Sequence, residues 1–153
     1  MSDITLWIDA DSCPLLVRNH VVKTAATKNL TVNFVANKNI SCDFNNFNMI
    51  ITEQTKDSAD NYIFENAGQK DLVITKDIIF ASRLVEKQIA VINDRGIEFT
   101  TENIKELLSE REYNYNLSQI GLVKHFHEGY DNKKFKKFAD CFDKVLNRLI
   151  RNI

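Results

Sequence analysis

Short apolar runs that alternate with helical segments constrain the fold of this chain more than any other feature of its sequence. The runs are rich in Val and Ile, which is typical of buried parallel strands. We expect strands at residues 4–9, 31–36, 48–52, 72–75 and 89–92, and helices at residues 14–28, 58–67, 78–87, 101–112 and 132–151. Parallel strands need crossover helices on both faces of their sheet. The order therefore predicts an α/β fold: a three-layer α/β/α sandwich around a mostly parallel sheet of about five strands.

Length and composition are those of one ordinary globular domain, which we expect to span residues 1–153. The chain is 44% hydrophobic and 27% charged, with a net charge of −1. Three cysteines at irregular spacing favour neither a disulfide framework nor a zinc site. No apolar run is long enough for a membrane span and no secretory signal is visible, so we expect a cytoplasmic protein with no membrane partner. Residues 113–132 show no clear period and are interpreted as a loop or flap.

Carboxylates recur where the predicted strands end and the predicted helices begin. Asp9 ends the first strand, Asp60 lies in the first turn of the helix at 58–67, and Asp77 follows the strand at 72–75. The carboxyl ends of parallel strands converge on one crevice, so we expect these three side chains to meet. Such a cluster repels itself, and a hard divalent cation with oxygen ligands is its usual counter-charge. The sequence therefore predicts a Mg²⁺ or Mn²⁺ site with Asp9, Asp60 and Asp77 as metal-ligating and catalytic residues.

Helix capping is the alternative explanation for several of these acids. Asp11, Asp57 and Asp77 each stand before a predicted helix, where a carboxylate accepts hydrogen bonds from the first backbone N–H groups. Asp60 lies where the helix dipole favours a negative charge in any case. Asp11 and Asp57 are accordingly further candidate metal ligands with capping as the competing role. Asp94, after the last predicted strand, is either an additional ligand or a turn residue, and we favour the turn.

Polar and basic residues near these positions are candidate substrate-binding groups. Asn37 follows the second strand, and Thr75 stands beside Asp77. Arg83 and Arg95 are cations able to offset phosphate charge. The final helix carries an apolar stripe beside a basic stripe that includes Lys134 and Lys137. The basic stripe is either a solvated face or a surface that tracks a phosphate backbone.

Five segments together resemble the YaiI/YqxD family of bacterial proteins. They are WIDADSCP (7–14), VAN (35–37), DSADNYI (57–63), DLVITKDI (71–78) and NDRG (93–96). The resemblance covers about residues 4–121, with Asp94 where the family usually has Pro. The family's pattern is similar to that of PIN-like domains, which are α/β nucleases with an acidic, Mg²⁺- or Mn²⁺-dependent site. The resemblance implies a PIN-like fold and places the acidic positions of that pattern on Asp9, Asp60 and Asp77.

Three hypotheses for function follow. The first is a metal-dependent nuclease with RNA as the expected partner. The second is a domain that binds a metal or nucleic acid without cleaving it. The third and weakest is a phosphatase, because a strand ending Asp9-Ala10-Asp11 resembles the Asp-x-Asp nucleophile motif of haloacid-dehalogenase-type phosphatases. Cys13 stands where that motif has Thr or Val. The sequence leaves the oligomeric state open.

Overall fold

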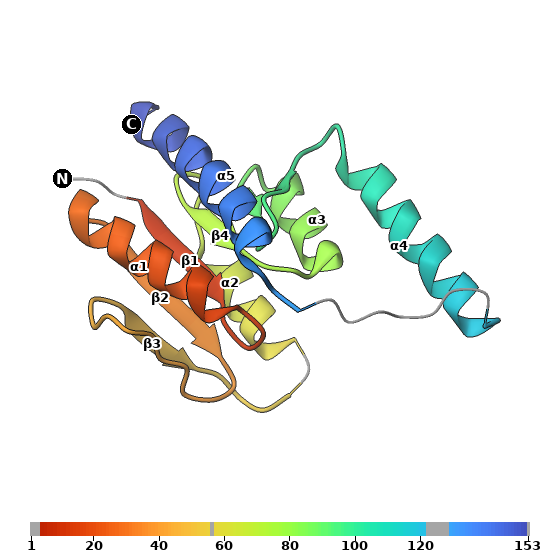
Figure 1. Cartoon of the computed structure of the whole chain (residues 1–153), viewed down its shortest axis with the longest axis horizontal. Coiled ribbons are helices and arrows are strands. Elements are labelled where there is room, and N and C mark those ends of the chain that lie inside the picture. Colours follow the sequence, from red (N-terminus) through yellow and green to blue (C-terminus); the bar gives the residue numbers. More distant parts are fainter. Residues whose placement is uncertain (1–3, 56, 122–128, 153) are drawn as a thin grey trace.

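The computed structural model describes residues 4–55, 57–121 and 129–152 (Figure 1). The strands in this part of the chain are β1 (Thr5–Asp9), β2 (Thr31–Ala36), β3 (Asn48–Ile51), β4 (Leu72–Ile74), β5 (Ala90–Ile92) and β6 (Glu98–Phe99). The helices are α1 (Leu15–Lys28), α2 (Ser58–Asn66), α3 (Ile78–Glu86), α4 (Ile104–Gln119) and α5 (Asn132–Arg151). None of the helices described is both long enough and apolar enough to cross a membrane.

The strands form one sheet in the order β3-β2-β1-β4-β5-β6. Neighbouring strands are parallel, except that β6 runs antiparallel to β5. The predicted three-layer α/β fold is confirmed, and it is consistent with the PIN-like arrangement implied by the resemblance. Strand β6 was not predicted, because a strand of two residues has no periodic signal in the sequence. The chain winds outward in opposite directions from the β1–β4 pair, so the sheet has a topological switch point between these two strands.

Alternating side chains of the strands divide the core between the two faces of the sheet. Leu6 and Ile8 of β1 join the apolar cluster beneath α1 and α5, where Phe138 and Phe142 are fully buried. Trp7 points the other way, into the cluster beneath α2, α3 and the start of α4. Asp9 comes directly after Ile8, so alternation directs it toward the face that α2 and α3 cover.

Helix α4 is longer than predicted. It runs to Gln119, so the expectation of a loop from residue 113 is wrong for residues 113–119. Among its described residues only Ile104 is buried, and Tyr113 and Tyr115 are largely exposed. Figure 1 shows the helix extending away from the sheet layers. The absence of a buried face explains why periodicity did not reveal its second half. Residues 122–128 of the expected flap lie outside the described residues.

Candidate functional site

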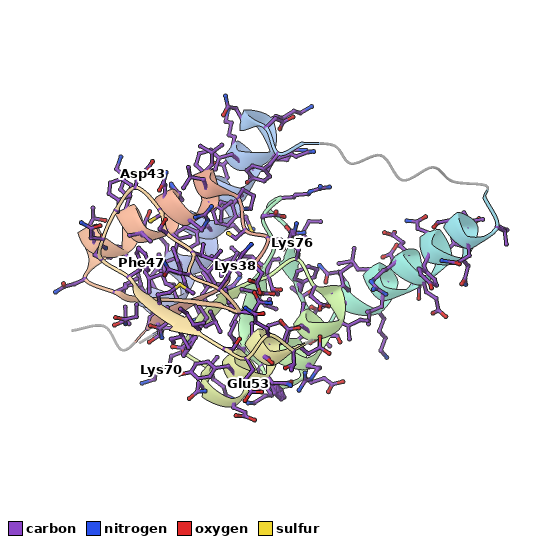
Figure 2. The ribbon with its side chains drawn as sticks, turned by 90° about the horizontal axis from the view of Figure 1, so that it is seen from below. Lys38, Asp43, Phe47, Glu53, Lys70 and Lys76 are labelled. Atoms are coloured by element: carbon purple, nitrogen blue, oxygen red, sulfur yellow. The ribbon has the colours of Figure 1, made fainter. Side chains whose placement is uncertain are left out.

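The register of the sheet places Asp9 and Thr75 side by side at the switch point. Ile8 pairs with Ile74 across β1 and β4, and the next residue of each strand is Asp9 or Thr75. Both follow a residue of the α1/α5 core, so both side chains face α2 and α3. Figure 2 shows Lys38 and Lys76, which follow β2 and β4, near the middle of the view, with Phe47 and Lys70, which precede β3 and β4, further to the left. The acidic site lies at the carboxyl edge that Lys38 and Lys76 mark.

The Thr75 hydroxyl fixes two of the predicted residues. Thr75 is buried, and its Oγ1 donates a hydrogen bond to Asp9 Oδ2 at 2.9 Å. The same oxygen accepts the backbone N–H of Asp77 at 3.1 Å. Thr75, which we expected to bind substrate, therefore holds Asp9 and the start of α3 in place.

Three carboxylates meet beside this pair. One oxygen from each of Asp57, Asp60 and Asp77 lies within 4.8 Å of the others, a spacing that suits a shared cation. We call Asp9 and these three residues the acidic cluster. Asp77 also accepts the N–H of Phe80 at 3.1 Å, so it caps α3 with one oxygen. Capping and membership of the cluster are therefore compatible for Asp77.

Asp57 occupies the N-cap position of α2, but its side chain forms no capping hydrogen bond. Its backbone is left-handed, with φ of 68°. That conformation is uncommon outside glycine, although Asp tolerates it better than most residues. The alternative of Asp57 as a side-chain cap is thus wrong, and the residue joins the acidic cluster instead.

Asp60 and Asp9 are hydrogen-bonded to each other, and each carboxyl group shifts the pKa of the other. Burial, followed by the charges of Asp9 and Asp77, raises the pKa of Asp60 to about 8. Burial also raises the pKa of Asp9, against the hydrogen bond from Thr75, which lowers it. The mutual hydrogen bond of Asp60 and Asp9 raises the pKa of Asp60 and lowers that of Asp9, so Asp60 is the member of the pair that more readily holds the shared proton. Without a metal, burial and mutual repulsion therefore disfavour ionisation of all the carboxylates in the cluster. The ligand atoms that the cluster offers are all carboxylate oxygens, so these residues fit a hard divalent cation.

Basic side chains line the same cavity as three carboxylates of the acidic cluster. A cavity of about 460 Å³ is lined by Asp57, Asp60 and Asp77 together with the cations Lys76, Arg83 and Arg111. Arg83 lies over the Phe64 ring at 4.2 Å from its centroid, which steadies the guanidinium without neutralising it. A cavity lined by both carboxylates and cations suits a phosphate group held between a bound metal ion and the protein.

Two predicted residues lie at the same edge but outside the group of three carboxylates. Asp11 neither caps α1, whose N-cap position is Pro14, nor shares the spacing of Asp57, Asp60 and Asp77. Its carboxylate oxygens accept the backbone N–H of Asn37 at 3.3 and 3.4 Å. Asn37, which was predicted to bind substrate, therefore contacts this edge of the sheet through its backbone N–H group. Asp94 is buried in the turn after β5, as favoured from the sequence.

The remaining predicted cations are elsewhere. Arg95, Lys134 and Lys137 line a second cavity between the β5–β6 turn and α5. One structural carboxylate was missed: Asp71 is buried and accepts hydrogen bonds from Thr5 N–H, Gly68 N–H and the Trp7 indole. Asp71 precedes its strand, so it lies at the opposite edge from the acidic cluster. The sequence signal for this structural role was the position of Asp71 before an apolar run, because the candidate site residues follow such runs.

Fold and site define a class of protein: an α/β domain with a carboxylate cluster at the switch point of a parallel sheet. The chain belongs to the YaiI/YqxD family of uncharacterised bacterial proteins, whose family model matches residues 7–148. A UPF0178 protein of Treponema denticola is 39% identical over 95% of this chain and 94% of the relative. Others are 39% identical in Treponema pallidum, over 97% of this chain and 84% of the relative, and 36% identical in Trichlorobacter lovleyi, over 97% of each. No solved structure gives a significant match.

Proposed function

We propose that this protein is a metal-dependent nuclease that hydrolyses phosphodiester bonds, with RNA as its expected substrate. The observation that carries the proposal is the convergence of Asp57, Asp60 and Asp77 within 4.8 Å, beside an Asp9 that Thr75 holds in place. A mainly structural role for these acids does not explain a buried Asp60 that would be more stable as a neutral residue. The preference for RNA rests on the resemblance to PIN-like nucleases.

Each part of the site has a distinct task in this proposal. The metal ligands in this proposal are Asp9, Asp57, Asp60 and Asp77. They would hold Mg²⁺ or Mn²⁺, which would supply positive charge to the phosphoryl oxygens and activate a water molecule. Thr75 orients Asp9 and keeps its carboxylate turned toward Asp60. Lys76, Arg83 and Arg111 offset the charge of the phosphate at the rim of the cavity. To ligate the cation, Asp60 would release its proton to solvent.

The test is cleavage of labelled single-stranded RNA and DNA by the purified protein with added Mn²⁺ or Mg²⁺. Asp60→Asn and Asp77→Asn should abolish both cleavage and the heat of Mn²⁺ binding. Asp143→Asn, an exposed acid on α5, is the matched control and should change neither. Unchanged cleavage in the Asp60 and Asp77 variants would contradict the proposal.

Two other outcomes correspond to the alternative functions. Mn²⁺ binding without turnover on any nucleic acid would identify a non-catalytic binding domain. Hydrolysis of a small phosphate ester through an aspartyl-phosphate intermediate on Asp9 would identify a phosphatase. The hydrogen bonds from the Asn37 backbone N–H to Asp11 disfavour the phosphatase, because they occupy both carboxylate oxygens of the second acid of its motif.

A further inference from the structure

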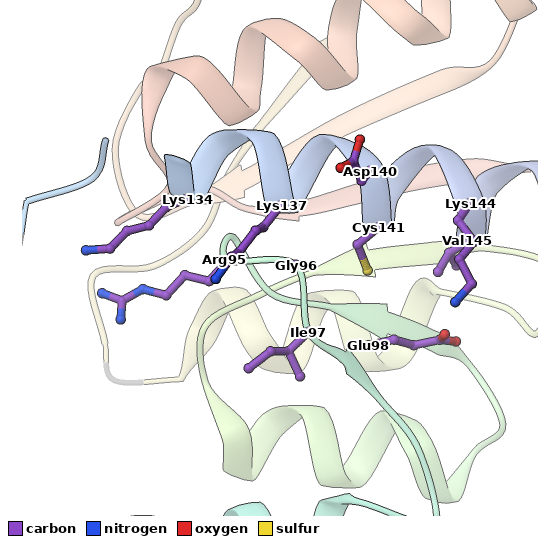
Figure 3. Close-up of a pocket in the computed structure, with 10 residues that line it drawn as sticks. All are labelled: Arg95, Gly96, Ile97, Glu98, Lys134, Lys137, Asp140, Cys141, Lys144 and Val145. Carbon is purple, nitrogen blue, oxygen red and sulfur yellow. The ribbon is translucent and has the colours of Figure 1, made fainter. Parts of the chain in front are cut away.

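A groove of about 730 Å³ lies between residues 134–145 of α5 and the turn that joins β5 to β6 (Figure 3). Four cations line it: Arg95 from the turn, and Lys134, Lys137 and Lys144 from one face of α5. We call this feature the basic groove. Figure 3 shows the Lys134 and Arg95 side chains extending in the same direction at one end, and Lys144 near the other end.

Acidic residues do not cancel this charge. Glu98 and Asp140 also line the groove, but Glu98 is already paired with Arg148, which donates two hydrogen bonds to its carboxylate. Within the described part of the chain, the side chains of Lys137 and Lys144 form no ion pair. The groove therefore presents a net positive surface although the chain as a whole has a net charge of −1.

Close backbone packing holds the two walls of the groove together. Gly96 has φ of 85°, and a Cβ at this position would lie 2.4 Å from the backbone oxygen of Lys137. The turn therefore approaches α5 more closely than any other residue would permit. This contact fixes the backbone of the turn against α5, so the fold sets the positions from which the Arg95 and Lys137 side chains extend.

The basic groove and the acidic cluster are neighbours along one edge of the sheet. Ile74 of β4 pairs with Ile92 of β5, so the turn that carries Arg95 follows at the edge where Thr75 stands. Lys76 connects the two sites, because it lines the acidic cavity and also acts on Asp94. Burial raises the pKa of Asp94, and the charges of Lys76, Arg95 and Lys134 oppose that rise, so cations that line both sites act on this residue.

We propose that the basic groove binds the sugar-phosphate backbone of a single-stranded nucleic acid on the β5 side of the acidic cluster. This inference rests on the proposed function, because it treats the groove as the path along which the strand leaves the cleavage site. From Lys134 to Lys144 the helix rises about 15 Å. A stacked strand with about 3.4 Å per nucleotide covers that length in about four nucleotides. Ile97, which is 39% exposed in the same groove, offers an apolar contact to unpaired bases.

The charge-reversal variant Lys137→Glu/Lys144→Glu tests this proposal. Its matched control is Lys133→Glu/Lys136→Glu, which makes the same change at exposed positions of α5 that do not line the groove. Binding of a fluorescein-labelled single-stranded RNA, the same DNA and an RNA duplex is measured by anisotropy over a range of salt, without added Mg²⁺ or Mn²⁺. The groove variant should lose about tenfold or more in affinity for a single strand, and its salt slope should fall by about 1.4, at about 0.7 for each lost contact.

Equal losses in the two variants, no loss in the groove variant, or tighter binding of the duplex than of the single strand would overturn the proposal. Thermal unfolding of both variants checks that they are folded. The RNA and DNA arms show which strand the groove accepts. A wild-type protein that binds through the groove but cleaves nothing contradicts the proposed function and leaves the groove supported. Cleavage that is unaffected by the groove variant contradicts only the groove.

Discussion

The hydroxyl of Thr75 donates a hydrogen bond to Asp9 Oδ2 at 2.9 Å, across the two strands that flank the switch point of the sheet. Because Thr75 Oγ1 also accepts the N–H of Asp77, this one side chain connects three positions of the site. Thr75→Val keeps the shape but removes both hydrogen bonds, and it should lower the free energy of unfolding by about 1–3 kcal/mol. It should also weaken Mn²⁺ binding, measured by calorimetry. Thr75→Ser keeps the hydroxyl and should stay close to wild type; equal losses in both variants would contradict this role.

Asp60 should make the metal-free protein less stable as pH rises. Its pKa is about 8 when folded, against an ordinary value of 3.8, so between these values the folded state binds the proton that the unfolded state has lost. The contribution of Asp60 is therefore fully present below about pH 4 and is lost as pH rises through about 8. Asp60→Asn should flatten this dependence and raise the melting temperature at pH 8, by about 2–4 °C for each kcal/mol gained. If the wild-type protein instead gained stability relative to Asp60→Asn as pH rises from about 4 to 8, the raised pKa of Asp60 would be contradicted.

Binding of Mn²⁺ should reverse that pH dependence and release a proton. At pH 7 Asp60 is mostly protonated, and a carboxylate must ionise to ligate a cation. Calorimetric titration in buffers of different ionisation enthalpy should therefore show release approaching one proton, which Asp60→Asn removes. At a concentration one hundred times the dissociation constant, the cation should stabilise the wild-type protein by about 2.7 kcal/mol. Stabilisation of the same size in Asp60→Asn would contradict the site.

Asp71 should be important for stability and unimportant for metal binding. Its carboxylate accepts the Trp7 indole N–H at 3.0 Å and the backbone N–H groups of Thr5 and Gly68 at 2.9 Å. Asp71→Ala leaves these donors without an acceptor in a buried place and should cost about 2–5 kcal/mol in denaturant unfolding. The folded fraction should bind Mn²⁺ with wild-type affinity; a loss of affinity would show that Asp71 influences the acidic cluster from the opposite edge.

Gly96→Ala should separate the two walls of the basic groove. The added Cβ meets the Lys137 carbonyl at 2.4 Å, and φ of 85° already disfavours alanine, so we expect a loss of about 1–3 kcal/mol in the free energy of unfolding. Gly129→Ala is the matched control, because its Cβ would meet nothing within 4 Å. Equal stability of the two variants would show that the turn does not pack closely on α5.

The sequence by itself determined the layers of the fold and most of the site. Short apolar runs define β1 to β5, because a strand buried on both faces must be apolar throughout. The rule that parallel strands converge at their carboxyl ends was sufficient to group Asp60 and Asp77 with Asp9. The stripe of Phe135, Phe138 and Phe142 likewise predicted α5, since a helix that packs on a sheet needs a periodic apolar face.

Only the tertiary structure decided what each polar side chain contacts. Asp11 and Asp57 both stand before helices, yet one accepts the Asn37 N–H and the other joins the acidic cluster through a left-handed backbone. Local propensity cannot separate such outcomes, because capping, turn formation and metal ligation draw on the same carboxylate chemistry. The basic groove also depends on a contact between Gly96 and Lys137, which are far apart in the sequence. Periodicity in the sequence indicates which face of a helix or strand is buried. Which residue of another element packs against that face is decided by the packing of the whole chain.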